Sequence, residues 1–286
     1  MRRTPAPGGI PHPQGTLQHT MADHVLITGG AHRLGQLLVR SFAQAGWHVW
    51  CHYARSADAA QALQQELRAG GWAVDTVAAD LAHESEVLTM MAHIAQRSGG
   101  LRAVVNNASV FEPDTGMDFD PALARRQLEV NLIAPLLLGR ELARQQAARR
   151  ASAPDADACV VHLLDQKVFN LNPDYFSYTT SKLALERSVA LQAQSLAPSV
   201  RVCGVAPGLI YPSGPQSDDN FARASRVNLL RRSINPQDVA DTCLFLAANP
   251  GINGATLAVD NGQHLVPLER DVMFAINTLK TQPGHG

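Results

Sequence analysis

Tyr178 and Lys182 are four residues apart near the start of a predicted helix, so their side chains project from one face toward the same point. A free tyrosine has a pKa of about 10 and is a poor proton donor or base near neutrality. A neighbouring ammonium stabilises the phenolate, so we expect Lys182 to lower the pKa of Tyr178 toward the working range. The pair therefore predicts proton transfer between the phenol and a bound substrate.

A glycine-rich turn follows the first predicted strand. It reads Thr28-Gly29-Gly30-Ala31-His32-Arg33-Leu34-Gly35 and leads into a predicted helix. Glycines let a ligand approach the backbone closely, and the N-terminus of the helix favours a pyrophosphate. Because the turn lies between a strand and a helix at the head of an alternating pattern, it predicts a dinucleotide site. The expected contacts are Gly29, Arg33, Leu34 and Gly35.

The second predicted strand ends in Cys51-His52-Tyr53-Ala54-Arg55-Ser56. NAD enzymes usually place a carboxylate about 20 residues beyond the glycines, where it binds the ribose hydroxyls, and this segment has none. Its guanidinium and hydroxyl suit a 2′-phosphate, which favours NADPH/NADP+ over NADH. The expected contacts are His52, Tyr53, Arg55 and Ser56. The alternative is that Arg55 is an ordinary solvated arginine before a helix.

Two further strand ends supply candidate cofactor contacts. Asp80 and Leu81 follow the third predicted strand, where the adenine ring should rest, although Asp80 could instead cap the next helix. Asn107, Ala108 and Ser109 end the fourth strand, and the asparagine amide can tie that strand to its neighbours. This segment is expected to line the nicotinamide side. Tyr178 and Lys182 are expected there too, with Lys182 holding the nicotinamide ribose.

Short β-branched runs alternate with longer helical patterns from Asp23 onward, which is typical of a parallel sheet covered on both faces. The strands are expected at 24–28, 48–52, 73–78, 103–106, 159–164, 200–205 and 256–259, and the helices at 34–45, 57–69, 85–97, 123–150, 178–196 and 236–248. The predicted fold class is α/β: a single doubly wound parallel sheet of about seven strands with helices on both faces.

Composition excludes several classes of partner. A formal net charge of −1 over 286 residues, with scattered basic residues, gives no field for nucleic acid or an anionic membrane. Four widely spaced cysteines indicate reduced, buried thiols in a cytoplasmic protein, and no metal site is predicted. No apolar run approaches the roughly 20 residues of a membrane span. Residues 1–20 are expected to be a disordered extension, with Met21 as a possible start and 21–286 as one domain.

These motifs together resemble the short-chain dehydrogenase/reductase family from about Asp23 to Leu265. The matching segments are Thr28 to Gly35, Asn106 to Ser109, Asn131, Tyr178 with Lys182, and Ala206-Pro207-Gly208. The resemblance implies a Rossmann-type fold, further cofactor contacts from Pro207, Gly208 and Ile210, and a water held by Asn131 that extends a proton relay from the lysine. It also implies a homotetramer assembled through the long helices at 123–150 and 178–196.

Two departures from the family pattern narrow the resemblance. Arg33 stands where the family usually has glycine, and Asp165, 13 residues before Tyr178, stands where it usually has serine. In both positions the chain resembles pteridine reductases and dihydromonapterin reductases, which also have an arginine in the glycine turn and an aspartate before the tyrosine and lysine. An ionised aspartate accepts hydrogen bonds only, which suits a nitrogen-rich ring better than a simple ketone. By that resemblance Phe111 stacks on a pterin ring and Ser109 contacts substrate or cofactor phosphate; the alternative for Phe111 is a core residue.

The resulting hypothesis is hydride transfer from NADPH to a C=N bond of a dihydropterin-like ring. Tyr178 is then the proton donor, Lys182 lowers its pKa, and Asp165 orients the ring and the proton. Dihydrobiopterin, dihydromonapterin and dihydrofolate are candidate substrates, and the polar segment 211–228 is the expected substrate lid. Two alternatives stay open: a short-chain reductase of ketones or aldehydes, and a non-catalytic NADP(H)-sensing protein.

Overall fold

The computed structural model describes residues 23–150, 157–214 and 216–276. The expected N-terminal extension and Met21 lie outside the described residues. Within the described ranges, no helix is long and apolar enough to cross a membrane. All four cysteines are free and buried, which confirms their prediction as small core residues.

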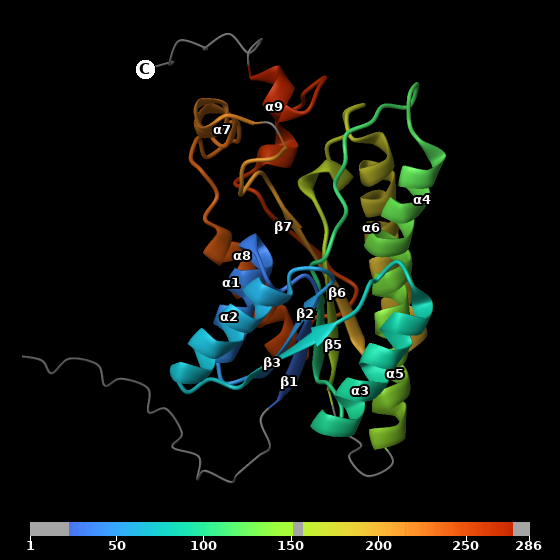
Figure 1. Cartoon of the computed structure of the whole chain (residues 1–286). Helices are drawn as coiled ribbons and strands as arrows, with labels where there is room; N and C mark the ends of the chain where they lie inside the picture. The colour runs from blue at the N-terminus through green and yellow to red at the C-terminus, as the bar shows by residue number, and fades with distance from the viewer. Residues whose placement is uncertain (1–22, 151–156, 215, 277–286) are drawn as a thin grey trace, which may run out of the picture.

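A parallel sheet of seven strands forms the centre of the protein (Figure 1). Its strands are β1 (His24–Ile27), β2 (His48–Tyr53), β3 (Val74–Ala78), β4 (Ala103–Asn106), β5 (Cys159–Leu163), β6 (Arg201–Pro207) and β7 (Thr256–Val259). They lie in the order β3-β2-β1-β4-β5-β6-β7, and every neighbouring pair is parallel. The predicted doubly wound Rossmann-type fold is therefore confirmed.

Helices cover both faces of the sheet, as Figure 1 shows. The larger ones are α1 (Arg33–Gln44), α2 (Ala57–Ala69), α3 (Glu84–Ser98), α4 (Pro121–Leu128), α5 (Ala134–Arg150), α6 (Phe176–Leu196) and α8 (Pro236–Ala248). One buried cluster joins the sheet to α1, α2 and α8, and a second joins it to α3, α5 and α6. Strands β4, β5 and β6 are buried at every residue because helices pack on both faces of the sheet, which explains their mainly apolar sequences.

The helix predicted at 123–150 is wrong as a single regular element. Pro121 starts α4, with the Asp120 carboxylate accepting a hydrogen bond from the backbone N–H of Ala122. A π-helical turn, η1 (Glu129–Ile133), then separates α4 from α5. Such a turn adds a residue to the helical path, and it often occurs at functional sites. Here it contains Asn131.

Several short elements were not predicted: η2 (Gln166–Val168), α7 (Asp218–Ala224), η3 (Gln263–Leu265) and α9 (Val272–Ala275). Helices α7 and α9 contact each other beyond the carboxyl ends of the strands (Figure 1). The strand order reverses between β1 and β4, and ligands of doubly wound sheets bind at the carboxyl edge of such a switch point. These short elements therefore lie where a ligand is expected.

Candidate active site

A cavity of about 530 Å³ opens at the carboxyl ends of the strands. It reaches from the glycine turn after β1 to the residues that follow β5 and β6. It brings together most of the predicted site residues, namely Gly29, Arg33, Leu34, Gly35, His52, Arg55, Asp80, Leu81, Asn107, Ala108, Ser109, Phe111, Asp165, Tyr178, Lys182, Pro207, Gly208 and Ile210. Three predicted residues are not part of its lining: Tyr53, Ser56 and Asn131.

The shape of the glycine turn depends on its glycines. Gly29 has a φ of 62°, in the left-handed region that favours glycine. A Cβ on Gly35 would lie 2.0 Å from the carbonyl oxygen of Gly29, so a side chain there would displace the turn. The Asn107 amide donates to the carbonyl oxygens of Thr28 and Gly29 at 2.9 and 3.1 Å, which ties β4 to the turn as predicted.

His52 supports this turn from beneath. Its Nδ1 accepts a hydrogen bond from the backbone N–H of Gly29 at 3.0 Å, and its Nε2 lies 3.0 Å from the carbonyl oxygen of Ala79. Only the neutral ring with its proton on Nε2 satisfies both contacts. Burial agrees with that form, because it lowers the pKa of His52 to about 4. Both ring nitrogens are thus engaged with the protein, so His52 stabilises the turn, and its contact with a cofactor stays a prediction.

Of the residues predicted as cofactor contacts at the end of β2, some line the cavity and others do not. Arg55 lines the cavity and makes no hydrogen bond or ion pair with any described residue. Tyr53 instead packs against the buried cluster beneath α1 and α2, and Ser56 precedes α2 without a side-chain cap bond. Neither Tyr53 nor Ser56 lines the cavity, and a contact of either residue with a cofactor stays a prediction.

Arg33 and Asp80 each show a second role. The Arg33 guanidinium donates to the carbonyl oxygen of Pro212 at 2.7 Å and lies 5.2 Å from the centroid of the Tyr211 ring. Arg33 therefore joins the glycine turn to the loop after β6. The Asp80 carboxylate accepts from the backbone N–H of Ala82 at 3.0 Å, so it stabilises the turn before α3 while also lining the cavity.

Tyr178 and Asp165 form the polar contact at the far end of the cavity. The phenolic hydroxyl donates to Oδ2 of Asp165 at 3.0 Å. Burial raises the pKa of Asp165, although the backbone N–H and the ammonium of Lys167 oppose this. Burial and the Asp165 charge raise the pKa of Tyr178 well above its ordinary value. The expectation that the Tyr178 pKa falls is therefore wrong for the phenol beside an ionised Asp165.

Lys182 lies beside this pair without a hydrogen bond to either member. Its ammonium donates to the carbonyl oxygen of Leu163 at 2.7 Å and lies 5.8 Å from the centroid of the Tyr178 ring. Burial lowers the pKa of Lys182 to about 8. The lysine is thus anchored to the end of β5, with two of its three N–H donors available to a ligand.

Asn131 does not line the cavity but forms hydrogen bonds with residues beside it. Its Oδ1 accepts from the backbone N–H of Val110 at 2.8 Å, and its Nδ2 donates to the Val110 carbonyl oxygen at 2.9 Å and to the Ser181 hydroxyl at 3.0 Å. The Ser109 hydroxyl also donates to its Oδ1 at 3.2 Å. The π-helical turn therefore holds the segment after β4 against α6. Its part in a relay from Lys182 stays a prediction.

Aromatic rings form the outer wall of the substrate end. Phe111 stacks on Tyr175 with centroids 4.2 Å apart, and it meets the Tyr178 ring edge-on at 4.6 Å. Met273 from α9 packs against the same cluster. Phe111 lines the cavity, and its stacking on a pterin ring stays a prediction. Its stacking partner in the structure is Tyr175, which the sequence analysis missed.

Lys167 and Asp271 also line the cavity and were missed. The Lys167 ammonium lies 2.9 Å from Oδ2 of Asp271. A lysine two residues after Asp165 was a signal in the sequence, but nothing in the sequence placed a residue 104 positions later beside it.

Comparisons with known proteins agree with this geometry. Residues 29–264 match the family model described as enoyl-(acyl carrier protein) reductase. Dihydromonapterin reductase from Citrobacter koseri is 29% identical over 244 residues, covering 84% of this chain and 96% of that protein. The corresponding enzyme from Klebsiella pneumoniae is 26% identical over 242 residues, with the same coverage.

Two solved structures are similar over most of the chain. FolM alternative dihydrofolate reductase 1 from Brucella canis, complexed with NADP, has a TM-score of 0.79 and 36% identity, covering 86% of this chain and 95% of that one. Its counterpart from Brucella suis, also in complex with NADP, has a TM-score of 0.78 and 37% identity, covering 85% and 95%. Together with the sheet order and the cluster of Asp165, Tyr178 and Lys182, these likenesses show that the chain belongs to the short-chain dehydrogenase/reductase family, in its pteridine reductase-like branch.

Proposed function

We propose that the protein is an NADPH-dependent reductase of dihydropterin-like substrates. The observation that carries the proposal is the hydrogen bond from the Tyr178 hydroxyl to Asp165 inside the cavity. A buried carboxylate can accept from ring N–H groups when ionised and can donate a proton when neutral. The related proteins described as dihydromonapterin and alternative dihydrofolate reductases support this substrate class.

The residues of the cavity fit a bound dinucleotide phosphate. Gly29 and Gly35 let the turn close tightly at the start of α1, where the N-terminus of the helix favours a pyrophosphate. Arg55 has no protein partner among the described residues and is suited to a 2′-phosphate. NADPH, when bound there, supplies the hydride for the ring C=N bond. We assign the nicotinamide ribose to the two uncommitted N–H groups of Lys182.

Reduction of a C=N bond leaves a ring nitrogen that must receive a proton. We infer that Tyr178 donates it while Asp165 is neutral. The Asp165 hydroxyl then donates to the phenolic oxygen, which frees the phenolic hydrogen to face the substrate. As the phenolic proton moves to the ring nitrogen, the Asp165 proton moves to the phenolic oxygen. No persistent phenolate is needed, so the raised pKa of Tyr178 does not prevent the reaction, and the raised pKa of Asp165 favours its neutral form.

A spectrophotometric panel tests this function. Oxidation of NADPH is followed with 7,8-dihydromonapterin, dihydrobiopterin, dihydrofolate and a set of ketones. We expect turnover of at least one dihydropterin and a loss of 10²-fold or more in kcat for Tyr178→Phe, which removes the donor. Turnover of ketones alone, with activity kept in Asp165→Ser, would establish the carbonyl-reductase alternative.

The sensing alternative predicts a different outcome. It requires that NADPH binds, that no substrate of the panel consumes it, and that Tyr178→Phe leaves the cellular phenotype intact. The intact placement of Tyr178 and Lys182 beside Asp165 favours catalysis instead.

We further propose a cytoplasmic homotetramer. The four buried, unpaired cysteines are in keeping with a reducing compartment. Ile133 in η1 and Leu191 in α6 are exposed apolar residues on the elements that the family resemblance assigns to assembly. Light scattering of the purified protein gives the oligomeric state directly.

A further inference from the structure

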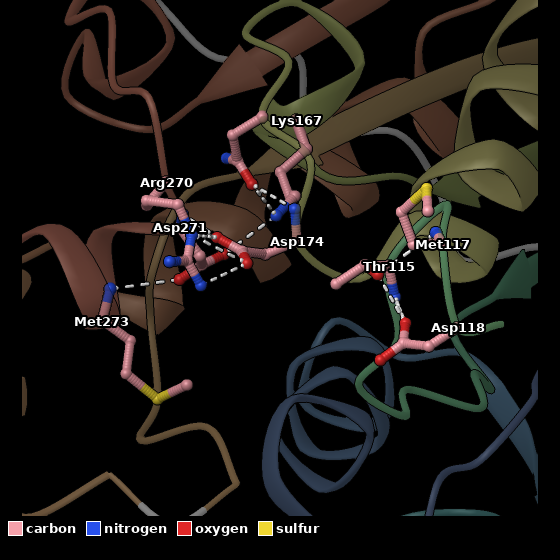
Figure 2. A network of polar contacts seen from close by, with 9 residues as sticks. Thr115, Met117, Asp118, Lys167, Asp174, Arg270, Asp271 and Met273 are labelled. Carbon is pink, nitrogen blue, oxygen red and sulfur yellow. Dashed lines mark hydrogen bonds and ion pairs between the residues drawn. The ribbon is translucent and has the colours of Figure 1, made fainter.

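The C-terminal segment that leads into α9 is fixed to the candidate active site by two ion pairs. Arg270 binds the carboxylate of Asp174 through Nε and Nη2, and the backbone N–H of Asp271 donates to the same carboxylate at 2.7 Å. Asp174 is only 4% exposed. Figure 2 shows Lys167 and Asp174 turned toward Arg270 and Asp271.

The second ion pair lies closer to the chemistry. The Lys167 ammonium, in a residue 2% exposed, contacts Oδ2 of Asp271 and Oδ1 of Asn172, each at 2.9 Å. The backbone N–H of Lys167 donates to Oδ1 of Asp165 at 2.9 Å. Asp165 uses its other oxygen for Tyr178, so both of its oxygens are engaged.

Charges of opposite sign therefore face the Asp165 carboxyl from neighbouring elements. Within the described part of the chain, the interacting ionisable groups are Tyr178 and Lys182 from α6, Lys167 from η2 and Asp271 from the segment before α9. Lys167 favours the ionised carboxylate, and Asp271 favours the neutral acid. The ion pair between them makes these effects partly cancel.

We propose that Lys167 and Asp271 are positioning residues whose paired charges set the proton content of Asp165, and thereby the pH range in which the enzyme works. The pair also joins the C-terminal segment, which walls the substrate end, to the loop that holds Asp165. This inference rests on the proposed function, in which Asp165 must be neutral to supply the proton. The rate then falls as pH rises through the Asp165 pKa.

The test uses two substitutions with opposite expected effects. Lys167→Met leaves Asp271 unbalanced, so the Asp165 pKa rises and the high-pH limb of kcat moves upward. Asp271→Asn leaves Lys167 unbalanced, so that limb moves downward. We expect each shift to be on the order of half a pH unit or more, and we expect the double variant to return toward the wild-type profile. Lys167→Arg should retain the wild-type limb because it keeps the positive charge.

Arg270→Met is the matched control. It loosens the same segment by removing the Asp174 ion pair, but its side chain is 55% exposed and it does not contact Asp165. We expect a higher KM, with the high-pH limb of kcat at the same pH as in the wild type. If both pair variants move the limb in the same direction, or neither moves it, the inference is overturned.

A measurement without turnover separates the two proposals. Carboxyl ¹³C NMR of aspartate-labelled protein, with Asp165→Asn used for assignment, reports the Asp165 titration directly. Opposite displacements in the two variants support the charge role even if no dihydropterin is reduced, a result that would defeat the proposed function alone. Unchanged titration in both variants defeats the charge role whatever the activity.

Discussion

Arg55 is the residue on which the choice of cofactor depends. It lines the cavity at the end of β2 and is not engaged with other described side chains, so its charge is available to a ligand. A hydrogen bond between charged groups contributes about 1.5–3 kcal/mol. We therefore expect Arg55→Leu to raise the Kd of NADPH by about tenfold or more while leaving that of NADH nearly unchanged. Fluorescence titration with both cofactors measures this.

A remote arginine provides the control for that comparison. Arg97 is exposed near the end of α3, so Arg97→Leu removes the same charge from the protein without touching the cavity. The ratio of the two Kd values should stay at the wild-type value in this variant. An equal loss of NADPH affinity in both variants would mean that overall charge, rather than a 2′-phosphate contact, explains the effect.

Gly35 tests whether NADPH binding depends on the shape of the glycine turn. A Cβ at this position would meet the Gly29 carbonyl oxygen at 2.0 Å, so Gly35→Ala must move the turn that is held by Asn107 and His52. We expect NADPH binding to be lost by isothermal titration calorimetry while the far-ultraviolet circular dichroism stays close to wild type. Gly251→Ala, where the nearest atom lies at 3.4 Å, should bind normally. Normal binding by Gly35→Ala would contradict the site.

At the scale of elements, the π-helical turn η1 positions the segment after β4. Asn131 is fully buried and supplies the hydrogen bonds that hold Val110 and Ser181 together. Asn131→Ala leaves those groups without partners, at a cost of about 1–3 kcal/mol for a buried polar group. We expect a lower Tm and a higher KM for NADPH. A Tm loss with unchanged KM would limit Asn131 to a structural role.

The regular elements were predictable because each has a local cause. β-Branched runs predicted β4 and β7 at their observed bounds, and the helical pattern did the same for α2 and α8. The π-helical turn was not predictable, since its cause is the tertiary contact of Asn131 with Val110 and Ser181.

Some residues of the candidate site were likewise predictable from the sequence, and others were not. Tyr178 and Lys182 are brought together by one helix, so their spacing was enough to find them. Asp165 follows β5 and was found by the family resemblance, because it stands where the family usually has serine. The contact of Lys167 with Asp271 joins residues 104 positions apart, and no local pattern marks such a pair. Tyr53 and Ser56 do not line the cavity, because a sequence position beyond a strand does not specify which side chains face the cavity.

For the molecule as a whole, two buried histidines link stability to pH. His52 in β2 and His162 in β5 are each held neutral, and burial lowers the pKa of both to about 4. In the unfolded chain a histidine titrates near 6.5. Between those values the unfolded state binds more protons, so the stabilisation is complete above about pH 6.5 and is lost as pH falls toward 4. Each histidine contributes on the order of 3 kcal/mol to this dependence.

We therefore expect the Tm to fall steeply between pH 7 and pH 4.5, as measured by differential scanning fluorimetry. His162→Gln should show a smaller fall over the same range, because glutamine does not take up a proton while Asn106 and Gln192, the present partners of the ring, remain polar. His83→Gln, at an exposed position, should follow the wild-type curve. A fall of equal size in wild type and His162→Gln would show that carboxylates rather than buried histidines control the acid stability of the protein.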